Sequence, residues 1–340
     1  RETTRCQHAW SWAVWFVVAW VLVVLGSFSG AMAADTGPRL VMAHGFGQDH
    51  PVQSGIERLR DRLAGTVTVE VGTWGDDRET VRAILAGELD AAVVSPAGLR
   101  DVAREVTLLD LIGLWWDRDH WARALDGEPG RQLAARVEGA KGETETGIRV
   151  LAYWGGTRRH LLTRREGVPT LEALATLRLG IPLKPVRSKM WKALGVRPIL
   201  LSRREASSAL HDGTVEGVEG DAETILRERL FEAAPHLTET GHAIATRLLV
   251  VGATAWRRLS RTQQAAVVAA ASDATTVARE AEVKREADAL ASLRDRFGVT
   301  ITKFTRRDAL ISRTRSIRYR YANEVGTSGL LTLIEQSARP

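Results

Sequence analysis

The sequence predicts an α/β protein with two α/β units in tandem and one long helix near its C-terminal end. Short apolar segments alternate with segments of helical periodicity in two series, with a change near Tyr153-Trp154-Gly155-Gly156. Residues 261–296 then contain neither Gly nor Pro and are dominated by Ala, Glu, Arg and Leu. Alternating strands and helices favour parallel sheets joined by right-handed crossovers. A crevice between two such units is a usual place for a ligand.

The first unit is expected to run strand, helix, strand, helix, strand. Its elements are a strand at 39–43, a helix at 51–64, a strand at 67–71, a helix at 77–86 and a strand at 89–94. Val52, Ile56 and Leu59 recur at spacings of four and three, which places them on one face of a helix. Apart from Asp90, the last strand is apolar, as in a parallel sheet that is covered on both faces.

The second unit shows the same alternation with shorter signals. Its elements are strands at 148–154, 177–181, 198–201 and 215–218, with a helix at 205–211. Ser260 and Gln263 then form a capping box, and Gly298 is a usual terminator for the helix that follows. A continuous helix over 261–296 would be about 54 Å long and could join two domains. A broken helical hairpin or a coiled-coil segment is the alternative.

The N-terminal segment has the pattern of an export signal. Arg1 and Arg5 precede an apolar run at residues 9–25, and Ala31-Met32-Ala33 is a small-x-small cleavage site. We therefore expect residues 1–34 to direct export and the functional protein to work in the periplasm. A retained membrane anchor is the alternative, since a run of about 17 apolar residues is at the lower limit for a span.

Composition argues against several classes of function. The formal net charge is +6, but Arg and Lys are scattered among Asp and Glu, so nucleic acid is not an expected partner. The single cysteine, Cys6, lies in the export segment. His44 and His50 have no ligand at metal-binding spacing, and no nucleophile elbow or phosphate-cradling glycine loop is found. We therefore expect no metal, no cofactor and no catalytic residue.

Several segments, in order along the chain, resemble one protein family. They are His50-Pro51 before the first helix, 85–92 (LAGELDAA), 108–115 (LLDLIGLW), 119–127 (DHWARALDG), 209–219 (ALHDGTVEGVE) and 255–260 (AWRRLS). Together they resemble the solute-receptor subunits of tripartite ATP-independent periplasmic (TRAP) transporters, of the dicarboxylate-receptor (DctP) type. Gly113 and Trp115 depart from the family pattern.

The resemblance implies a two-domain, periplasmic-binding-protein-like fold whose long helix spans both domains. Domain I would comprise 35–155 with 242–283, domain II would comprise 156–241 with 284–335, and the ligand cleft would lie between them. The implied function is capture of a small organic acid and its delivery to a TRAP membrane permease, without catalysis. An orphan binding protein that presents its ligand to a membrane sensor, or a secreted enzyme on a related fold, are the alternatives.

The resemblance also places a carboxylate-binding arginine at the end of a strand, where this chain has Gly180. A guanidinium suits a carboxylate because its planar fork makes two parallel charge-assisted hydrogen bonds. Three interpretations stay open. Gly180 could admit a bulkier or neutral ligand close to the backbone, or Arg178 could substitute from the same strand face. Lys184 or Arg187 could instead swing in from the next loop. A solvated surface position is the alternative role for Arg178.

Two more segments are expected to supply ligand contacts. Arg158 is the favoured contact in the loop 156–160, with Arg159 as the alternative in register. That loop is expected to follow the C-terminal end of a strand, where ligands of α/β proteins gather. An exposed basic loop is the competing interpretation.

Four further positions complete the expected site. Glu219-Gly220 stands where the family often has an acidic residue followed by Asn, so one polar contact is expected to be missing at Gly220. Trp74 and Trp154 are candidate wall residues, although a tryptophan is more often part of the core.

Overall fold

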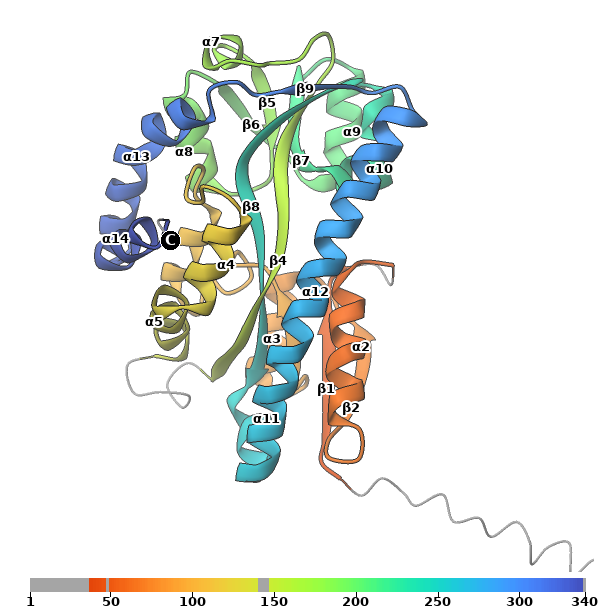
Figure 1. Ribbon diagram of the computed structural model, residues 1–340, viewed down its shortest axis with the longest axis vertical. Coiled ribbons are helices and arrows are strands. Elements are labelled where there is room, and N and C mark those ends of the chain that lie inside the picture. Colours follow the sequence, from red (N-terminus) through yellow and green to blue (C-terminus); the bar gives the residue numbers. More distant parts are fainter. Residues whose placement is uncertain (1–36, 47–48, 140–146, 339–340) are drawn as a thin grey trace, which may run out of the picture. The chain divides into compact units, whose positions relative to one another are not determined.

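Nine strands form one mixed sheet in the computed structural model, which describes residues 37–46, 49–139 and 147–338 (Figure 1). The strands are β1 (Arg39–His44), β2 (Thr68–Thr73), β3 (Ala91–Val94), β4 (Ile148–Thr163), β5 (Arg178–Ile181), β6 (Arg197–Leu200), β7 (Gly217–Asp221), β8 (His236–Gly252) and β9 (Thr300–Lys303). Their order is β2-β1-β3-β8-β4-β7-β5-β6, and β9 pairs with β8. The export signal expected at residues 1–34 lies outside the described residues.

Each half of the sheet has a parallel part, as the alternating pattern predicts. In the first half β1 pairs in parallel with β2 and β3, and in the second half β5 pairs in parallel with β6 and β7. The expected strands and helices are confirmed in both halves, with bounds that shift by a few residues, except that β4 continues to Thr163. The α/β fold class is therefore correct.

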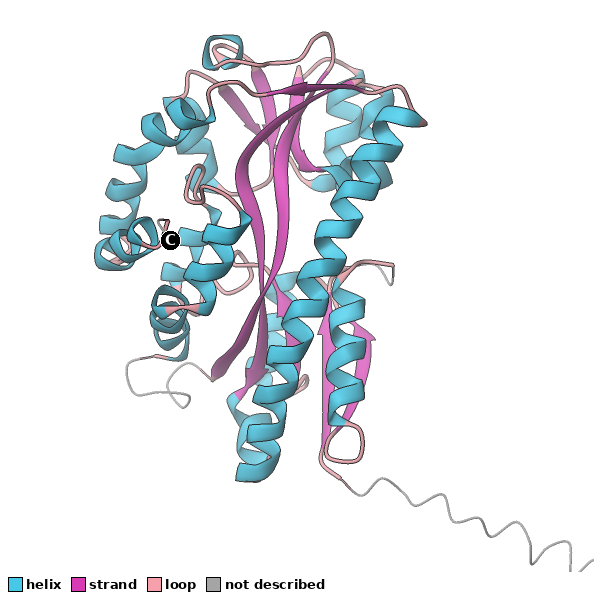
Figure 2. Cartoon of the chain, viewed as in Figure 1, coloured by secondary structure: helices cyan, strands magenta, loops and turns pink. Residues whose placement is uncertain are grey.

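Helices cover both faces of the sheet (Figure 2). They are α2 (Val52–Leu63), α3 (Asp77–Ala86), α4 (Arg118–Asp126), α5 (Glu128–Glu138), α7 (Leu171–Leu174), α8 (Pro185–Ala193), α9 (Arg203–His211), α10 (Ala222–Arg227), α11 (Ala253–Arg258), α12 (Arg261–Asp295), α13 (Arg307–Glu324) and α14 (Ser328–Gln336), with the 3-10 helices η1 (Arg104–Asp110) and η2 (Leu230–Glu232). Within the described residues, no helix is both long enough and apolar enough to span a membrane.

Two long antiparallel strands, β4 and β8, connect the parallel parts (Figure 1). The ladder between them is irregular at Gly155-Gly156, whose φ angles are +112° and +115°. A Cβ atom at Gly155 would lie 2.2 Å from the carbonyl oxygen of Ala245, so glycine is required there. The sequence predicted only the first part of β4, and it assigned no element to β8.

The long helix α12 is one continuous element, as predicted. The Ser260 side chain accepts from the backbone N–H of Gln263, and the Gln263 side chain accepts from the Ser260 N–H. The helix packs along α2 and β4 and, further on, against α10, so it contacts elements of both halves. The close approach to α2 occurs at Gly55, where a Cβ atom would lie 2.7 Å from that of Ala278.

The C-terminal helices also contact both halves. Helix α13 packs against α8, whereas α14 packs against α5. The Nε2 atom of His120 in α4 lies 2.8 Å from the carbonyl oxygen of Ile334 in α14. The proposed domain II segment 284–335 therefore lies against elements of the proposed domain I as well, and the domain division stays a prediction.

Candidate functional site

A network of buried charged side chains lies where β4, β7, β8 and α8 meet. Its centre is Glu219 of β7, whose carboxylate is fully buried. One oxygen accepts from Arg187 Nη1 at 2.8 Å. The other accepts from Trp191 Nε1 at 3.0 Å and lies 3.0 Å from His242 Nε2. Glu219 therefore has partners on both oxygens, which is what a buried carboxylate needs.

These contacts fix the charge states of the network. Burial alone would raise the pKa of Glu219, but the guanidinium groups of Arg187 and Arg159 hold it well below its usual range. Burial lowers the pKa of His242 to about 4, although the contact with Glu219 opposes this. A neutral His242 can donate from Nε2 to Glu219 while Nδ1 accepts from the hydroxyl of Thr240, which is 2.7 Å away.

Arg159 joins this network from β4. It stands opposite Asp221 in the β4–β7 ladder, and paired residues of antiparallel strands project to the same face. Its Nη2 donates to the carbonyl oxygen of Glu219 at 3.1 Å, and Nη1 lies 3.6 Å from Asp221 Oδ2. The Nε atom is buried and has no hydrogen-bond partner among the described residues. Such a donor normally has an acceptor, so this atom marks a place for one.

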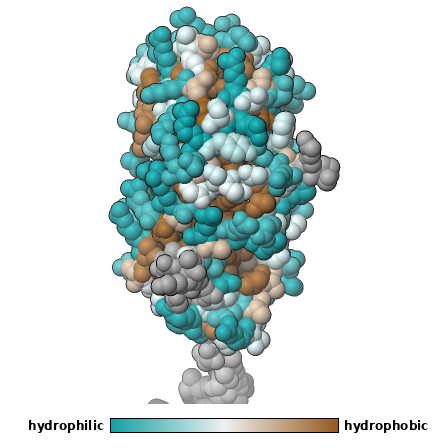
Figure 3. All heavy atoms as spheres, turned by 90° about the vertical axis from the view of Figure 1, so that its left-hand side faces the viewer, coloured by the Kyte–Doolittle hydropathy of each residue, from teal (hydrophilic) through white to brown (hydrophobic). Residues whose placement is uncertain are grey.

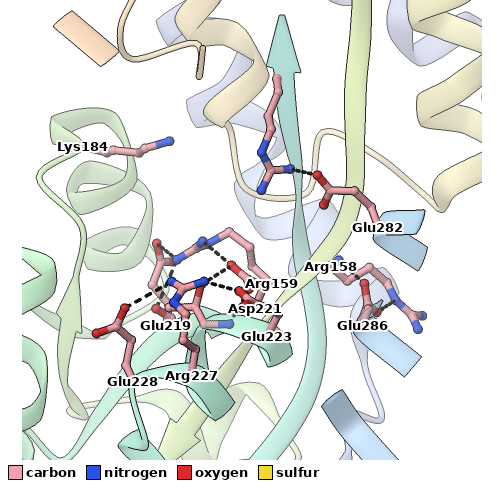
Figure 4. Close-up of polar contacts among 12 residues, drawn as sticks. Arg158, Arg159, Lys184, Glu219, Asp221, Glu223, Arg227, Glu228, Glu282 and Glu286 are labelled. Atoms are coloured by element: carbon pink, nitrogen blue, oxygen red, sulfur yellow. Dashed lines mark hydrogen bonds and ion pairs between the residues drawn. The ribbon is translucent and has the colours of Figure 1, made fainter. Parts of the chain in front are cut away.

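Arg158 points the other way, toward α12 (Figure 4). Its backbone N–H and its Nε donate to Glu286 at 2.7 and 3.2 Å, and Arg118 Nη2 lies 2.6 Å from the same carboxylate. Burial would raise the pKa of Glu286, but the nearby His160 ring and the charge of Arg118 lower it to about 2. The structure therefore places Arg158 in a strand-to-helix ion pair, and Arg159 in the buried network.

The two glycines of the expected site face apolar side chains. A Cβ atom at Gly180 would lie 2.7 Å from Leu201 Cδ1 and 3.1 Å from Val218 Cγ1. A Cβ atom at Gly220 would lie 3.2 Å from Ile225 Cγ1. Leu201 and Ile225 thus pack closely on the backbone at the two positions where the family resemblance predicts polar side chains.

The other basic candidates near β5 have acidic partners. Arg178 is about half exposed and pairs with Glu216 at 3.7 Å, at the opposite end of β5 from Lys184. The Lys184 ammonium contacts the Asp110 carboxylate of η1, and Arg187 Nε donates to the Asp110 carbonyl oxygen at 3.0 Å. Burial lowers the pKa of Lys184 despite that partner. Lys184 and Arg187 thus join α8 to η1.

The two candidate tryptophans lie in different surroundings. Trp74 follows β2 and is 40% exposed, as a wall residue of an open site can be. Trp154 is fully buried in the apolar cluster formed by α2, α12 and the first strands, and its Nε1 donates to Thr275 Oγ1 at 3.0 Å. The structure therefore places Trp154 in the core.

A surface hollow of about 510 Å³ lies elsewhere, beside α13 and α14. It is lined by Gly113, Leu114, Trp116, Asp308, Ile311, Ser312, Arg315, Arg318, Glu335 and Ala338. Figure 3 shows this side of the molecule, where weakly polar and apolar residues interrupt a hydrophilic surface. None of the predicted site residues lines this hollow. Within the described residues, no cluster of three or more His, Cys, Asp or Glu is arranged to hold a metal ion.

Sequence reasoning missed important members of the network. His242 lies in β8 and Trp191 in α8, and the sequence predicted no element in either segment. Arg247 of β8 was missed as well. Its Nη2 lies 3.2 Å from His50 Nε2, and its Nη1 lies 2.5 Å from Glu282 Oε1 of α12.

The model of the bacterial extracellular solute-binding proteins, family 7, matches residues 42–316. The chain belongs to this family. The match confirms the resemblance to TRAP solute receptors, so the molecule is a solute-binding protein of that type.

Individual relatives are distant in sequence and similar over most of their length. A solute-binding protein of Sulfitobacter sp. strain NAS-14.1 is 27% identical over 82% of this chain and 84% of its own. The 2,3-diketo-L-gulonate-binding periplasmic protein YiaO of Escherichia coli K12 is 24% identical over 76% and 79%.

Solved structures of the same type share the fold. A TRAP periplasmic solute-binding protein of Ochrobactrum anthropi, with its C-terminus in the ligand-binding pocket, has a TM-score of 0.82 at 24% identity, over 89% of this chain and 96% of its own. Another from Sulfitobacter sp. NAS-14.1, with bound α-D-taluronate, has a TM-score of 0.77 at 24% identity, over 88% and 98%.

The stability of this solute-binding protein is expected to fall as the pH drops below about 6.5. His242 and Glu286 have folded-state pKa values of about 4 and about 2, below their ordinary values of 6.5 and 4.5. The unfolded chain therefore binds more protons as the pH falls, and unfolding is favoured. His242 alone is expected to cost about 2 kcal/mol of unfolding free energy between about pH 7 and about pH 5.

Urea unfolding at a series of pH values measures this dependence. His242→Gln keeps a donor for Glu219 but cannot titrate, so its unfolding free energy should fall less steeply between pH 6.5 and 5. An equal slope in the variant would show that His242 is not the group responsible.

Proposed function

We propose that the protein captures a small organic acid of the sugar-acid class, and that Arg159 binds the carboxylate of that solute. The observation that carries this is the buried Nε of Arg159, a charged donor without a partner among the described residues. An incoming carboxylate supplies the acceptor, and a charge-assisted hydrogen bond to a guanidinium is among the strongest available. Relatives support the ligand class, since solved family members hold taluronate, galactonate, galacturonate or glucuronate.

The proposed mechanism is a clamp of two domains, 35–155 with 242–283 and 156–241 with 284–335. The solute contacts both domains only when they close, so it shifts the population toward the closed form. The irregular ladder of β4 and β8 at Gly155-Gly156 is a natural place for bending, because both residues have φ angles that L side chains rarely adopt. Closure then presents the solute to a membrane permease of the TRAP type.

The export signal predicted at residues 1–34 supports a periplasmic location for this cycle. Delivery to the permease, and the absence of catalysis, follow from the family's role in solute binding and belong to the same proposal. The solute leaves chemically unchanged, so no residue is assigned to a catalytic step.

The test is a thermal-shift screen of the purified protein with D-glucuronate, D-galacturonate, galactonate and succinate, and with neutral D-galactose as a control. A bound acid at about 100 times its Kd should raise Tm by about 5 °C, since binding to the folded state stabilises by mass action. Arg159→Lys keeps the charge but loses Nε and the planar fork, so the shift should largely disappear.

Arg158→Lys is the matched control, because Arg158 is next to Arg159 in the chain but its guanidinium points to Glu286. Its shift should equal that of the wild-type protein. If no acid raises Tm, or if Arg159→Lys responds as fully as Arg158→Lys, the proposal is wrong.

A further inference from the structure

Arg247 occupies a buried position on β8, a strand that the sequence did not predict. The residue is 8% exposed, and its guanidinium carbon lies 4.7 Å from the centre of the Phe46 ring. Nη1 is 2.5 Å from Glu282 Oε1, close enough to pair as ions, yet the two atoms are misaligned for a hydrogen bond. The ion pair with Glu282 of α12 therefore leaves N–H donors of the Arg247 guanidinium available for another acceptor.

The second contact of Arg247, with His50, brings two hydrogen-bond donors close together. Its Nη2 lies 3.2 Å from His50 Nε2, while His50 Nδ1 lies 3.2 Å from the backbone nitrogen of Val52. Burial, followed by the charge of Arg247, lowers the pKa of His50 to about 2, so the ring is neutral and carries one N–H. Whichever ring nitrogen holds the proton, that N–H faces another N–H.

The helix terminus decides between the two tautomers. Val52 is the first residue of α2, and N–H groups in the first turn of a helix have no acceptor within the helix. Nδ1 therefore accepts from Val52, and the proton lies on Nε2. The Nε2–H of His50 and the Nη2–H of Arg247 then converge, and neither has another partner among the described residues. Two converging donors beside a helix N-terminus favour an anion between them.

Asp221 links this place to the proposed solute contact, because its carboxylate lies 3.6 Å from Arg159 Nη1 and also experiences the charge of Arg247. Burial raises the pKa of Asp221, but Arg159 and, more weakly, Arg247 lower it below its usual value, so both guanidinium groups act on one carboxylate. Arg247 stands on β8 and Arg159 on β4, the two strands that connect the halves of the sheet. Among the described residues, Glu282 of α12 is in contact with Arg247, and Asp221 of β7 interacts with it through its charge.

We propose that Arg247 and the Nε2–H of His50 bind the carboxylate of the solute together with Arg159. Arg247 thereby takes the place of the arginine that the family resemblance predicts at the position of Gly180, where Leu201 packs. This inference rests on the proposed function and names a second guanidinium for the same site. Because His50 precedes α2 and Arg159 lies in β4, one carboxylate held by both joins the two proposed domains.

Isothermal titration with D-glucuronate, D-galacturonate and galactonate tests the role of Arg247. The variant Arg247→Gln/Glu282→Gln removes both charges of the ion pair and leaves no buried carboxylate unpaired. Its affinity for an acid that the wild-type protein binds should fall about 10- to 100-fold, as expected for loss of a hydrogen bond to a charged group. His50→Phe keeps the ring stacking on Phe46 and should weaken binding by a smaller factor.

The chain offers a matched control in Arg279. Its guanidinium carbon lies 4.6 Å from the Trp121 ring centre, and it makes two 2.7 Å contacts with Asp126. Arg279→Gln/Asp126→Asn removes a similar pair away from the site and should leave affinity unchanged. Arg247→Lys should fold even if the double variant does not, and should also bind more weakly.

The outcomes separate the two proposals. A wild-type protein that binds none of the acids contradicts the proposed function. A wild-type protein that binds an acid, with an Arg247 variant that binds it equally well, overturns the role of Arg247 alone.

Discussion

Replacing Glu219 by Ala is expected to lower the free energy of unfolding by about 3–5 kcal/mol, the range found when one partner of a buried ion pair is removed. The carboxylate accepts from Arg187 and Trp191 and contacts His242, all within the buried network. Without it, Asp110, at 3.6 Å, is the one acidic partner left to the Arg187 guanidinium within the described part of the chain. Desolvated donors without acceptors are the source of the cost.

Urea unfolding followed by tryptophan fluorescence measures this effect, with Glu232→Ala as the control. Glu232 pairs with Arg229 on the surface, where both side chains are about half exposed, and such pairs contribute little. Glu219→Gln keeps an acceptor for Trp191 and should lie between the wild-type protein and the Ala variant. A Glu219→Ala protein as stable as Glu232→Ala would show that the network does not hold the fold together.

Much of the candidate site depends on contacts that a sequence does not display. Glu219 and the pair Arg158-Arg159 could be named because their segments resemble a family. The choice between Arg158 and Arg159 as the ligand contact could not be predicted, because it depends on which face of β4 each side chain occupies. That face is set by the pairing of Arg159 with Asp221, some sixty positions away in the chain.

The same dependence on contacts that are distant in the chain explains why β8 was not predicted. Residues 236–252 form β8, but Thr238, Thr240 and His242 interrupt the apolar pattern of its first half. Their side chains are polar because they serve the buried network and the neighbouring turns, as in the contact of His242 with Glu219. By contrast α12 was predicted correctly, since capping residues and an uninterrupted run of helix formers are local signals.

Two glutamates of α12 show how that helix is tied to the central strands. Glu282 and Glu286 are both almost fully buried and lie one turn apart. Glu282 faces Arg247 of β8, whereas Glu286 is bound by Arg158 of β4. Burial raises the pKa of Glu282, while the partners of Glu286 lower its pKa to about 2. The charged form of Glu282 is therefore less favoured by its surroundings than that of Glu286.

Trp154→Ala is expected to cost about 3–5 kcal/mol of unfolding free energy, through the cavity that remains when a fully buried aromatic ring is removed. The ring of Trp154 lies beneath the closest approach of α2 and α12, where a Cβ atom at Gly55 would be 2.9 Å from it. The backbone at Gly55 and the side chain of Ala278 cannot readily collapse into the space, because both belong to long helices. Thr275 loses its partner Nε1, but its hydroxyl still donates to Ala271.

Trp116→Ala is the matched control for this change, because its side chain is about half exposed and should cost no more than about 0.5 kcal/mol. Chemical denaturation gives both values, and titration with a bound acid gives the affinity. A core role for Trp154 requires lower stability with unchanged affinity in the folded fraction, whereas a wall role in the solute site requires weaker binding at nearly normal stability. The second result would contradict the placement of Trp154, since a side chain that is completely enclosed between a strand and two helices cannot also face a solute.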